Sequence, residues 1–383
     1  MCVRRLRRPG MTIVLLAAAL LAACSRAGET PQFHGDGWPE NLSDWRLMKV
    51  EKGALVLSEG VHPYDLATPL FSDYALKLRT VTLPEGEAAT YDETEAFNFP
   101  VGTIVSKTFY YPQAGAEWTG DVSYKDASLK GPTAIDGEMA LDGLRLIETR
   151  LLVRRDNGWV AIPYLWDGDQ KDARLARTGE IVKLTLHRPD GRAEPFNYLV
   201  PNQNQCAGCH GTNMNKRAIS PIGLKARHLN KPSRFQPQVN QLADWSASGI
   251  LKGAPIDSAA PRNAIWMDAS ASVEARARSY LDINCSHCHS NTGPADTSGL
   301  DLRPAIAFGP GAGLCKTPIA AGAGTGARAY DIVPRHPERS IFVYRMTTNE
   351  PGEMMPELGR AVSHEEGVRL IAEWIREMEG NCG

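Results

Sequence analysis

Alternating apolar and polar positions dominate residues 41–200. Residues 103–111 form a β-branched and aromatic run that stops at Pro112, as a buried strand does. Residues 150–166 predict a hairpin, since Asn157-Gly158 favours a tight turn between two apolar runs. Residues 181–187 alternate with period two and turn toward a second apolar run. This region therefore predicts a mainly antiparallel β domain.

The apolar spacing lengthens to three and four after Pro201. Residues 274–282 predict a helix with Ser272 as its N-cap, and residues 240–251 predict another. A last helix is expected to begin at a capping box over residues 363–366 and to end near Gly380. A Gly-, Ala- and Pro-rich stretch before it predicts loops. The C-terminal half is thus expected to be mainly helical.

The N-terminus has the pattern of an export signal. Four arginines precede an apolar run of about 13 residues, too short for a membrane span of roughly 20. The run ends in Leu21-Ala22-Ala23-Cys24, which resembles a bacterial lipobox and implies cleavage before a lipidated Cys24. The alternative is an ordinary signal peptide cut after an A-x-A-like site. We expect a signal peptide over residues 1–23, a tether over 24–40 and a periplasmic protein anchored to a bacterial membrane, the outer membrane being favoured by Ser25.

Length and charge narrow the class of protein. The chain has 383 residues, 43% hydrophobic and 22% charged, which fits a globular protein of two or three domains. Its formal net charge of −2 provides no basic field for nucleic acid. We expect no nucleic-acid partner.

Two C-x-x-C-H motifs carry the chemistry. They are Cys206-Ala207-Gly208-Cys209-His210 and Cys285-Ser286-His287-Cys288-His289. This spacing lets two thiols bond the vinyl groups of one porphyrin while the histidine becomes a proximal ligand of the iron. A redox dithiol does not explain the two histidines, and a zinc ribbon has its cysteine pairs closer together. The sequence predicts two covalently bound haem c groups, with Cys206, Cys209, Cys285 and Cys288 as attachment points and His210 and His289 as iron ligands.

Met355 is the candidate for the opposite side of the second iron. The order of second motif, loops, Met355-Pro356 and final helix resembles class I cytochrome c over about residues 270–380. That resemblance implies His289/Met355 ligation. The alternatives are that Met355 only packs in the core, and that Met354 or no residue is the ligand.

The first haem has no comparable candidate. Met214, Met267 and His228 are possible ligands opposite His210, and Met214 is the one retained. His287 is interpreted as a filler residue of the second motif. An iron without a sixth ligand would be open to small molecules.

Two cysteines remain once the motifs and the lipid site are assigned. Cys315 and Cys382 are expected to form a disulfide in an oxidising compartment, and the alternative is two free buried thiols.

The overall order of segments resembles a bacterial family of dihaem c-type cytochromes with an N-terminal β region. The resemblance lies in residues 201–206, 240–242 and 280–285 and in Met355-Pro356, and it spans most of residues 60–380. It implies a multidomain fold, in which a mainly antiparallel β domain (41–200) precedes mainly α, cytochrome c-like haem domains (201–268 and 269–383). It also implies electron transfer in the cell envelope.

The expected function is that of a lipid-tethered electron carrier rather than a substrate-converting enzyme. Its redox partner would be a dehydrogenase or another cytochrome. One alternative resembles dihaem peroxidases, with an open first haem and an aromatic relay through Trp245 or Trp266. Another alternative places the function in the β domain, as a docking or binding module that the haems serve.

Overall fold

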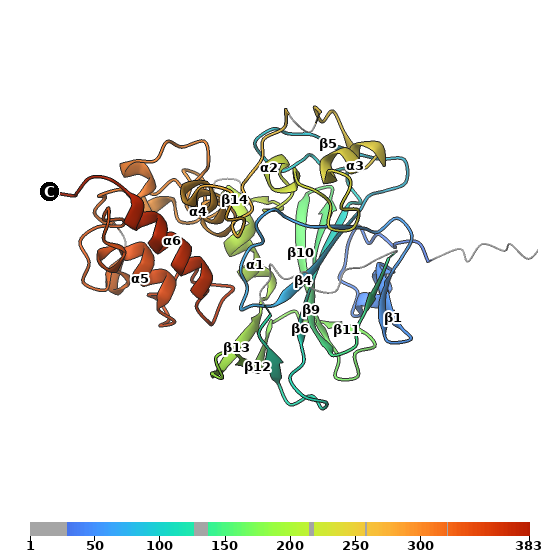
Figure 1. Cartoon of the computed structure of the whole chain (residues 1–383). Coiled ribbons are helices and arrows are strands. Elements are labelled where there is room, and N and C mark those ends of the chain that lie inside the picture. The colour runs from blue at the N-terminus through green and yellow to red at the C-terminus, as the bar shows by residue number, and fades with distance from the viewer. Residues whose placement is uncertain (1–28, 126–136, 214–217, 257–258, 320) are drawn as a thin grey trace, which may run out of the picture.

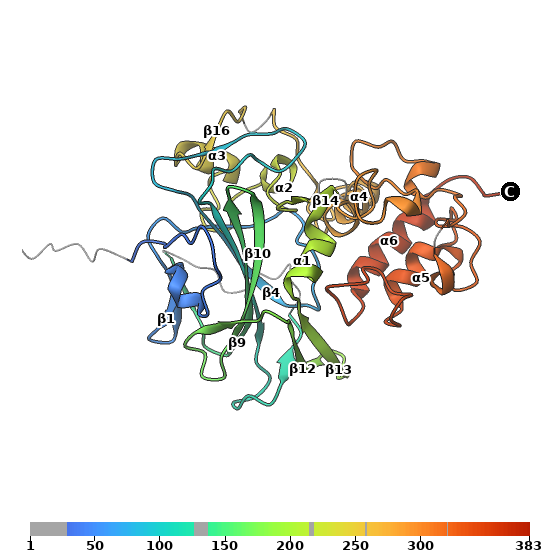
Figure 2. The same cartoon turned by 180° about the vertical axis from the view of Figure 1, so that it is seen from behind.

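A β-rich part and a helical part lie side by side in the molecule (Figure 1). The computed structural model describes residues 29–125, 137–213, 218–256, 259–319 and 321–383. The sheets form one side of the molecule, the helices nearest the C-terminus form the other, and the short helix α1 (Gln203–His210) lies between them in both views (Figures 1 and 2).

A six-stranded antiparallel sheet is the centre of the β-rich part. Its strand order is β11-β10-β9-β6-β4-β3. The strands are β3 (His62–Tyr64), β4 (Leu76–Thr82), β6 (Ile104–Pro112), β9 (Leu144–Arg155), β10 (Gly158–Trp166) and β11 (Ala173–Leu175). The predicted hairpin is confirmed, because β9 and β10 pair antiparallel from Arg155 opposite Gly158. Here the glycine has a φ of +125°, which other residues rarely adopt.

Smaller sheets surround this one. One joins β1 (Met48–Glu51), β2 (Ala54–Leu57) and β8 (Glu138–Ala140); another joins β13 (Ala193–Val200), β12 (Glu180–His187) and β7 (Asp121–Ser123). Two further pairs are β14 (Gly211–Asn213) with β15 (Ala218–Ile219), and β16 (Leu251–Lys252) with β5 (Ala89–Thr90). The β7–β12 and β16–β5 pairs are parallel, and the other pairs in these four sheets are antiparallel.

The prediction of mainly α, cytochrome c-like haem domains is wrong. The described residues contain six α-helices, most of them short: α1 (Gln203–His210), α2 (Ala226–Leu229), α3 (Gln241–Ala247), α4 (Val273–Leu281), α5 (Ile341–Thr347) and α6 (Glu365–Glu377). Several antiparallel sheets make the described chain mainly β. The physical reason is that loops rich in Gly and Pro interrupt helix formation after residue 201, so even the C-terminal part has only three α-helices among its described residues.

The starts of two helices test the predicted caps. Ser272 caps α4 as predicted, since its hydroxyl accepts a hydrogen bond from the N–H of Ala275. The capping box predicted for the last helix is wrong, because Ser363 instead donates its hydroxyl hydrogen to Met346 O, and α6 begins at Glu365. The N–H of Glu365 donates a hydrogen bond to the hydroxyl of Tyr74, which belongs to the β-rich part. A tertiary contact has therefore replaced the local cap.

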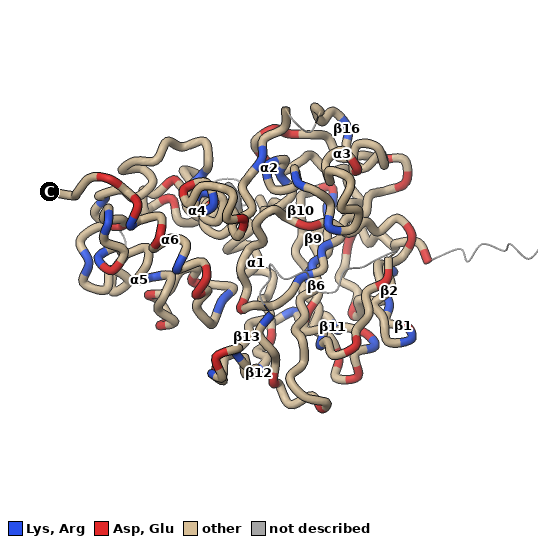
Figure 3. Tube along the Cα trace, viewed as in Figure 1, with Lys and Arg blue, Asp and Glu red and all other residues tan. Residues whose placement is uncertain are grey.

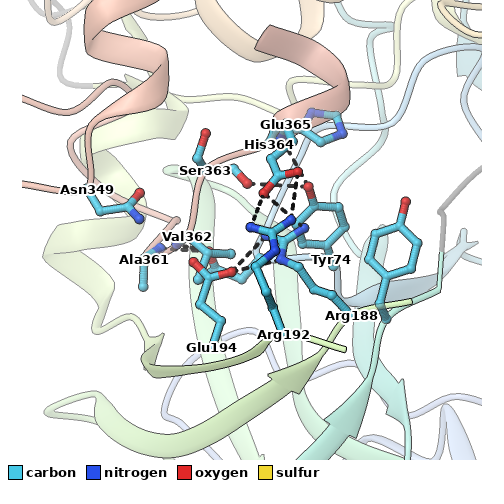
Figure 4. A network of polar contacts seen from close by, with 12 residues as sticks. Tyr74, Arg188, Arg192, Glu194, Asn349, Ala361, Val362, Ser363, His364 and Glu365 are labelled. Carbon is cyan, nitrogen blue, oxygen red and sulfur yellow. Dashed lines mark hydrogen bonds and ion pairs between the residues drawn. The ribbon is translucent and has the colours of Figure 1, made fainter. Parts of the chain in front are cut away.

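Polar contacts hold the helical part against the β-rich part (Figure 4). The guanidinium of Arg192, next to β13, donates to both carboxylate oxygens of Glu365 at 2.9 and 3.2 Å. Asp73 accepts hydrogen bonds from the N–H groups of Ala361 and Val362 at 2.7 and 2.9 Å. Because residues nearly 300 positions apart are bonded here, the two parts are held in a defined relation.

The helical part has a core of its own. Trp266, Tyr280, Ile371 and Trp374 are buried together between α4 and α6. A disulfide joins Cys315 to Cys382 and ties the C-terminal tail to the loops in front of α5. Among the described residues, no helix is long and apolar enough to pass through a bilayer.

Candidate functional site

The two C-x-x-C-H motifs lie against each other. The first motif ends α1, and the second begins within the π-helical turn Asp282–Ser286, which follows α4. The Sγ atom of Cys288 is 3.9 Å from the carbonyl oxygen of Gly208, in the middle of the first motif. A hydrogen bond from the Cys288 thiol lowers the pKa of Cys209, and the same contact raises the pKa of Cys288. All four motif cysteines are free of disulfides.

The first cysteine of each motif is held as a neutral thiol. Burial raises the pKa of Cys206 to about 11 and that of Cys285 to about 12. A zinc site requires thiolates and several converging ligands. Among the described residues, no group of three or more His, Cys, Asp or Glu side chains could hold a metal ion. The zinc interpretation therefore has no support in the described geometry.

The tautomer of His289 leaves one ring nitrogen available for iron. Its Nδ1 is 3.0 Å from the hydroxyl of Ser298, and that hydroxyl donates its only hydrogen to Ala295 O at 2.6 Å. The hydroxyl must therefore accept from Nδ1–H, and Nε2 carries a lone pair. Burial lowers the pKa of His289 to about 4, so the ring is neutral at pH 7.

His210 has the same arrangement with a different partner. Its Nδ1 lies 2.9 Å from the backbone oxygen of Ser220, which can only accept a hydrogen bond. Burial lowers the pKa of His210 to about 4. Both motif histidines are thus neutral and held through Nδ1, which is how proteins orient an imidazole that binds metal through Nε2.

The second motif opens into the larger cavity. This cavity has a volume of about 380 Å³, within the range of ligand sites, and Cys285, Cys288 and His289 line it. Its walls are mostly apolar, including Leu300, Leu302, Ile341 and Phe342. Met355 also lines the cavity, whereas Met354 does not. A second thioether, that of Met346 on α5, lines it as well and has no signal in the sequence.

The first motif faces a smaller cavity of about 140 Å³. Cys206, Cys209 and His210 line it, and strands β4, β6 and β9 contribute Arg79, Val105, Lys107 and Arg150–Leu152. No methionine is among its described lining residues. Its volume is below the usual range of ligand pockets, so a porphyrin here requires side chains to move apart.

The predicted ligands of the first iron lie elsewhere or outside the described residues. Met214 is outside the residues that the structure describes. Met267 packs against the α4–α6 core. His228 is 1% exposed, with Nε2 3.5 Å from Asp282 and Nδ1 3.3 Å from Asn263. Neither Met267 nor His228 lines the cavity of His210.

The proposed aromatic relay residues are also away from that cavity. Trp245 is buried and lies edge-on to Tyr64, with ring centroids 5.7 Å apart. Trp266 contacts Tyr280 and His364 in the helical part. Neither tryptophan is a lining residue of the cavity at His210.

His287 belongs to the wall between the two cavities and lines both. Its Nδ1 is buried and has no hydrogen-bond partner in the described part of the chain. Cys209, Asn284, Phe71 and Leu358 also line both cavities. The two sites are therefore neighbours with a common wall. Sequence reasoning treated His287 as filler because one residue inside a motif gives no sign of a second site beside it.

An ion pair supports the turn of the second motif. Arg227 Nε donates to Asp282 Oδ2 at 2.6 Å, and Arg227 Nη2 donates to Oδ1 at 3.0 Å. Although burial opposes it, the Arg227 contact holds the pKa of Asp282 well below its usual range. Ser286, inside the motif, donates to the backbone oxygen of Asp282 at 2.6 Å. The motif thus rests on a paired carboxylate that sequence reasoning did not single out.

The comparisons with known proteins found no family model, no curated protein and no solved structure that matches the chain. The resemblance to a dihaem cytochrome family is therefore corrected: no comparison supports it, and the described chain is mainly β without cytochrome-like haem domains. The described residues also lack a metal-holding group of three or more side chains. Function has to be argued from the residues of the two sites themselves.

Proposed function

We propose that the chain is an electron carrier with two covalently attached haem c groups, one at Cys206/Cys209 and one at Cys285/Cys288. The observation that carries the proposal is the pair of C-x-x-C-H motifs whose histidines are both half-buried, neutral and bonded through Nδ1. Two thiols and one oriented imidazole in that spacing are the donor set for haem c.

The residues of the second site fit such a group well. Its thiols would form thioethers, and His289 Nε2 and the thioether of Met355, which line the same cavity, would be the iron ligands. When bound, the haem supplies one-electron chemistry. The apolar walls exclude water, and Ser298 keeps the imidazole in one tautomer.

The residues of the first site also supply the donor set for haem c, but the cavity is smaller than a haem group needs. His210 is oriented by Ser220 as His289 is by Ser298, and both cysteines line the cavity. The common wall, with Cys209 and Cys288 in contact, supports direct electron transfer between the two sites.

The place of the protein in the cell is part of the proposal. The signal pattern of residues 1–23 and the lipobox cysteine Cys24 support export and lipid tethering on the periplasmic side, with the outer membrane favoured. These residues lie outside the described part of the structure. The partner would be another redox protein, either a dehydrogenase or a cytochrome.

Haem counting and a redox titration test this function. The full chain is produced in a bacterial host that attaches haem c, and haem is counted as the pyridine haemochrome. We expect two haems per chain and two reversible one-electron steps. A colourless protein, or haem that extracts into acidified organic solvent, would contradict the proposal because thioether-bound haem stays with the protein.

One observation favours a second function, that of a dihaem peroxidase. No methionine is among the described lining residues at His210, so the first iron would lack the thioether that Met355 offers at the second site. A high-spin ferric signal together with peroxide turnover would support this alternative. Low-spin spectra for both haems without turnover would rule it out.

A further inference from the structure

Three basic side chains lie in a straight row across the central sheet. Arg79 on β4 is directly opposite Lys107 on β6, and Lys107 is directly opposite Arg150 on β9. Figure 3 shows Lys and Arg positions close together in the sheet near β6 and β9. All three side chains line the cavity that contains Cys206, Cys209 and His210. The row therefore faces the first C-x-x-C-H motif.

The row has three basic side chains and two carboxylate partners. Like charges directly opposite each other on neighbouring strands destabilise a sheet. Arg79 is 3.5 Å from Asp65, and Arg150 Nε and Nη2 donate to the two carboxylate oxygens of Glu148 at 2.8 and 2.5 Å. Lys107 makes no hydrogen bond or ion pair within the described residues, and its ammonium group lies 4.8 Å from the ring of Phe109. No carboxylate is among the described residues that line the cavity.

One donor of the row is both buried and unused. The Nη2 atom of Arg79 has no hydrogen-bond partner among the described residues, and this side chain is only 5% exposed. Burial, with the nearby Arg79 charge as the next cause, lowers the pKa of Lys107 well below its usual value. A buried donor without a partner costs about 1–3 kcal/mol. An anion in the cavity would accept a hydrogen bond from Arg79 and pair with Lys107, and would so remove both unfavourable contributions.

We propose that the row of Arg79, Lys107 and Arg150 binds the two propionate carboxylates of the haem attached at Cys206 and Cys209. This inference rests on the proposed function. Haem carries two carboxylates, and guanidinium and ammonium groups are their strongest hydrogen-bond partners in proteins. The sheet then serves as the wall that holds the propionate groups, while α1 supplies the thiols and the imidazole.

The second site has no equivalent row. Arg360, which lines its cavity, already donates to the backbone oxygens of Met355 and Thr348 and to the side chain of Asn349. Arg345 donates to Glu353 O and lies 3.5 Å from Glu357. The basic groups there are satisfied by the chain itself. Charge-reversing changes in the row should therefore affect only the first haem.

The test compares Lys107→Gln and Lys107→Glu with Lys171→Gln in the full chain. Lys171 is a matched control because its side chain is 80% exposed and lies 3.2 Å from Asp169, in a loop outside both cavities. Haem is located by mass spectrometry of peptides, and the potentials are obtained by redox titration. Lys107→Gln should keep both haems and shift one redox step to lower potential, because a cation near that haem is gone. Lys107→Glu should lose haem from Cys206/Cys209 and keep it at Cys285/Cys288.

Other outcomes overturn the inference, and they differ from failure of the proposed function. Two haems with unshifted steps in both variants would show that the row does not meet the carboxylates. A redox potential of the wild-type chain that changes with phosphate concentration would show that a free anion, and not the propionates, binds the row. Conversion of one haem to high spin in Lys107→Gln would show that the amine binds iron. A wild-type chain without haem would overturn the proposed function, and this inference with it.

Discussion

The two C-x-x-C-H motifs share a donor set and differ in almost everything around it. The second faces a cavity of about 380 Å³ with apolar walls and two thioethers, Met355 and Met346. The first faces about 140 Å³, with three basic side chains and no methionine among its described lining residues. If each motif binds haem as proposed, the motif fixes the attachment and the proximal ligand, whereas the surrounding elements determine the other ligand and the charge at each iron.

The cause of the difference is the kind of structure that supplies each wall. Strands alternate their side chains, so the sheet presents Arg79, Lys107 and Arg150 on one face at matching register positions. The second wall is built from loops and short helices whose apolar residues pack around the cavity. The first site therefore has a wall with three aligned basic side chains, whereas the basic side chains at the second, Arg345 and Arg360, are bonded within the chain.

The largest expected effect is the loss of one haem. Cys285→Ala/Cys288→Ala should leave a single haem at the first motif, and Cys206→Ala/Cys209→Ala should leave one at the second, because each pair of thioethers holds its own group. Spectra of the two variants then separate the two sites. The comparison fails if the remaining haems have identical spectra and potentials.

A change of Met355 should alter the second iron without removing its haem. Met355→Leu should abolish low-spin His/Met features and lower the potential of one step, since a thioether opposite the imidazole raises it. Met346 lines the same cavity, so Met346→Leu is the matched control. Met354 does not line the cavity, so Met354→Leu is a control from outside it. If Met355→Leu keeps the low-spin His/Met features and one of the other two variants loses them, that other methionine is the iron ligand.

The disulfide should stabilise only the helical part. Cys315→Ser/Cys382→Ser opens a loop with a sequence separation of 67 residues, which costs about 4 kcal/mol in the chain-entropy model. When denaturant unfolding is followed at the absorption band of each haem, the lower free energy of unfolding should appear at the second haem. Equal loss at both haems would show that the two regions unfold as one unit.

Asp73 tests the junction between the two regions through pH. Burial raises its pKa to about 6, so in the folded state it binds its proton more tightly than in the unfolded chain. Its ionisation therefore lowers stability as the pH rises from about 4 to about 6, by about 3 kcal/mol at most. Asp73→Asn keeps the oxygen that bonds Ala361 and Val362. In urea unfolding, Asp73→Asn should have a higher free energy of unfolding than the wild type at pH 7.5 and nearly the same one near pH 4. A stabilisation that does not depend on pH would contradict the assignment to Asp73 ionisation.

Local features could be predicted from the sequence, and long-range ones could not. The β9–β10 hairpin, the N-cap Ser272 and the two C-x-x-C-H motifs depend on neighbouring residues. The start of α6 depends on Tyr74, which lies in another part of the fold. The row at Lys107 depends on the register of three strands, and no spacing along the chain indicates it. Helical content was overestimated because tertiary packing and glycine-rich loops override local periodicity.

The central claim is that each motif carries its own covalent haem. Mass spectrometry of peptides from the wild-type chain, matured in a bacterium that attaches haem c, tests it most directly. We predict two haem-bearing peptides, one containing Cys206 and Cys209 and the other Cys285 and Cys288. Peptides with four unmodified thiols, or a Cys209–Cys288 disulfide in place of haem, would contradict the account.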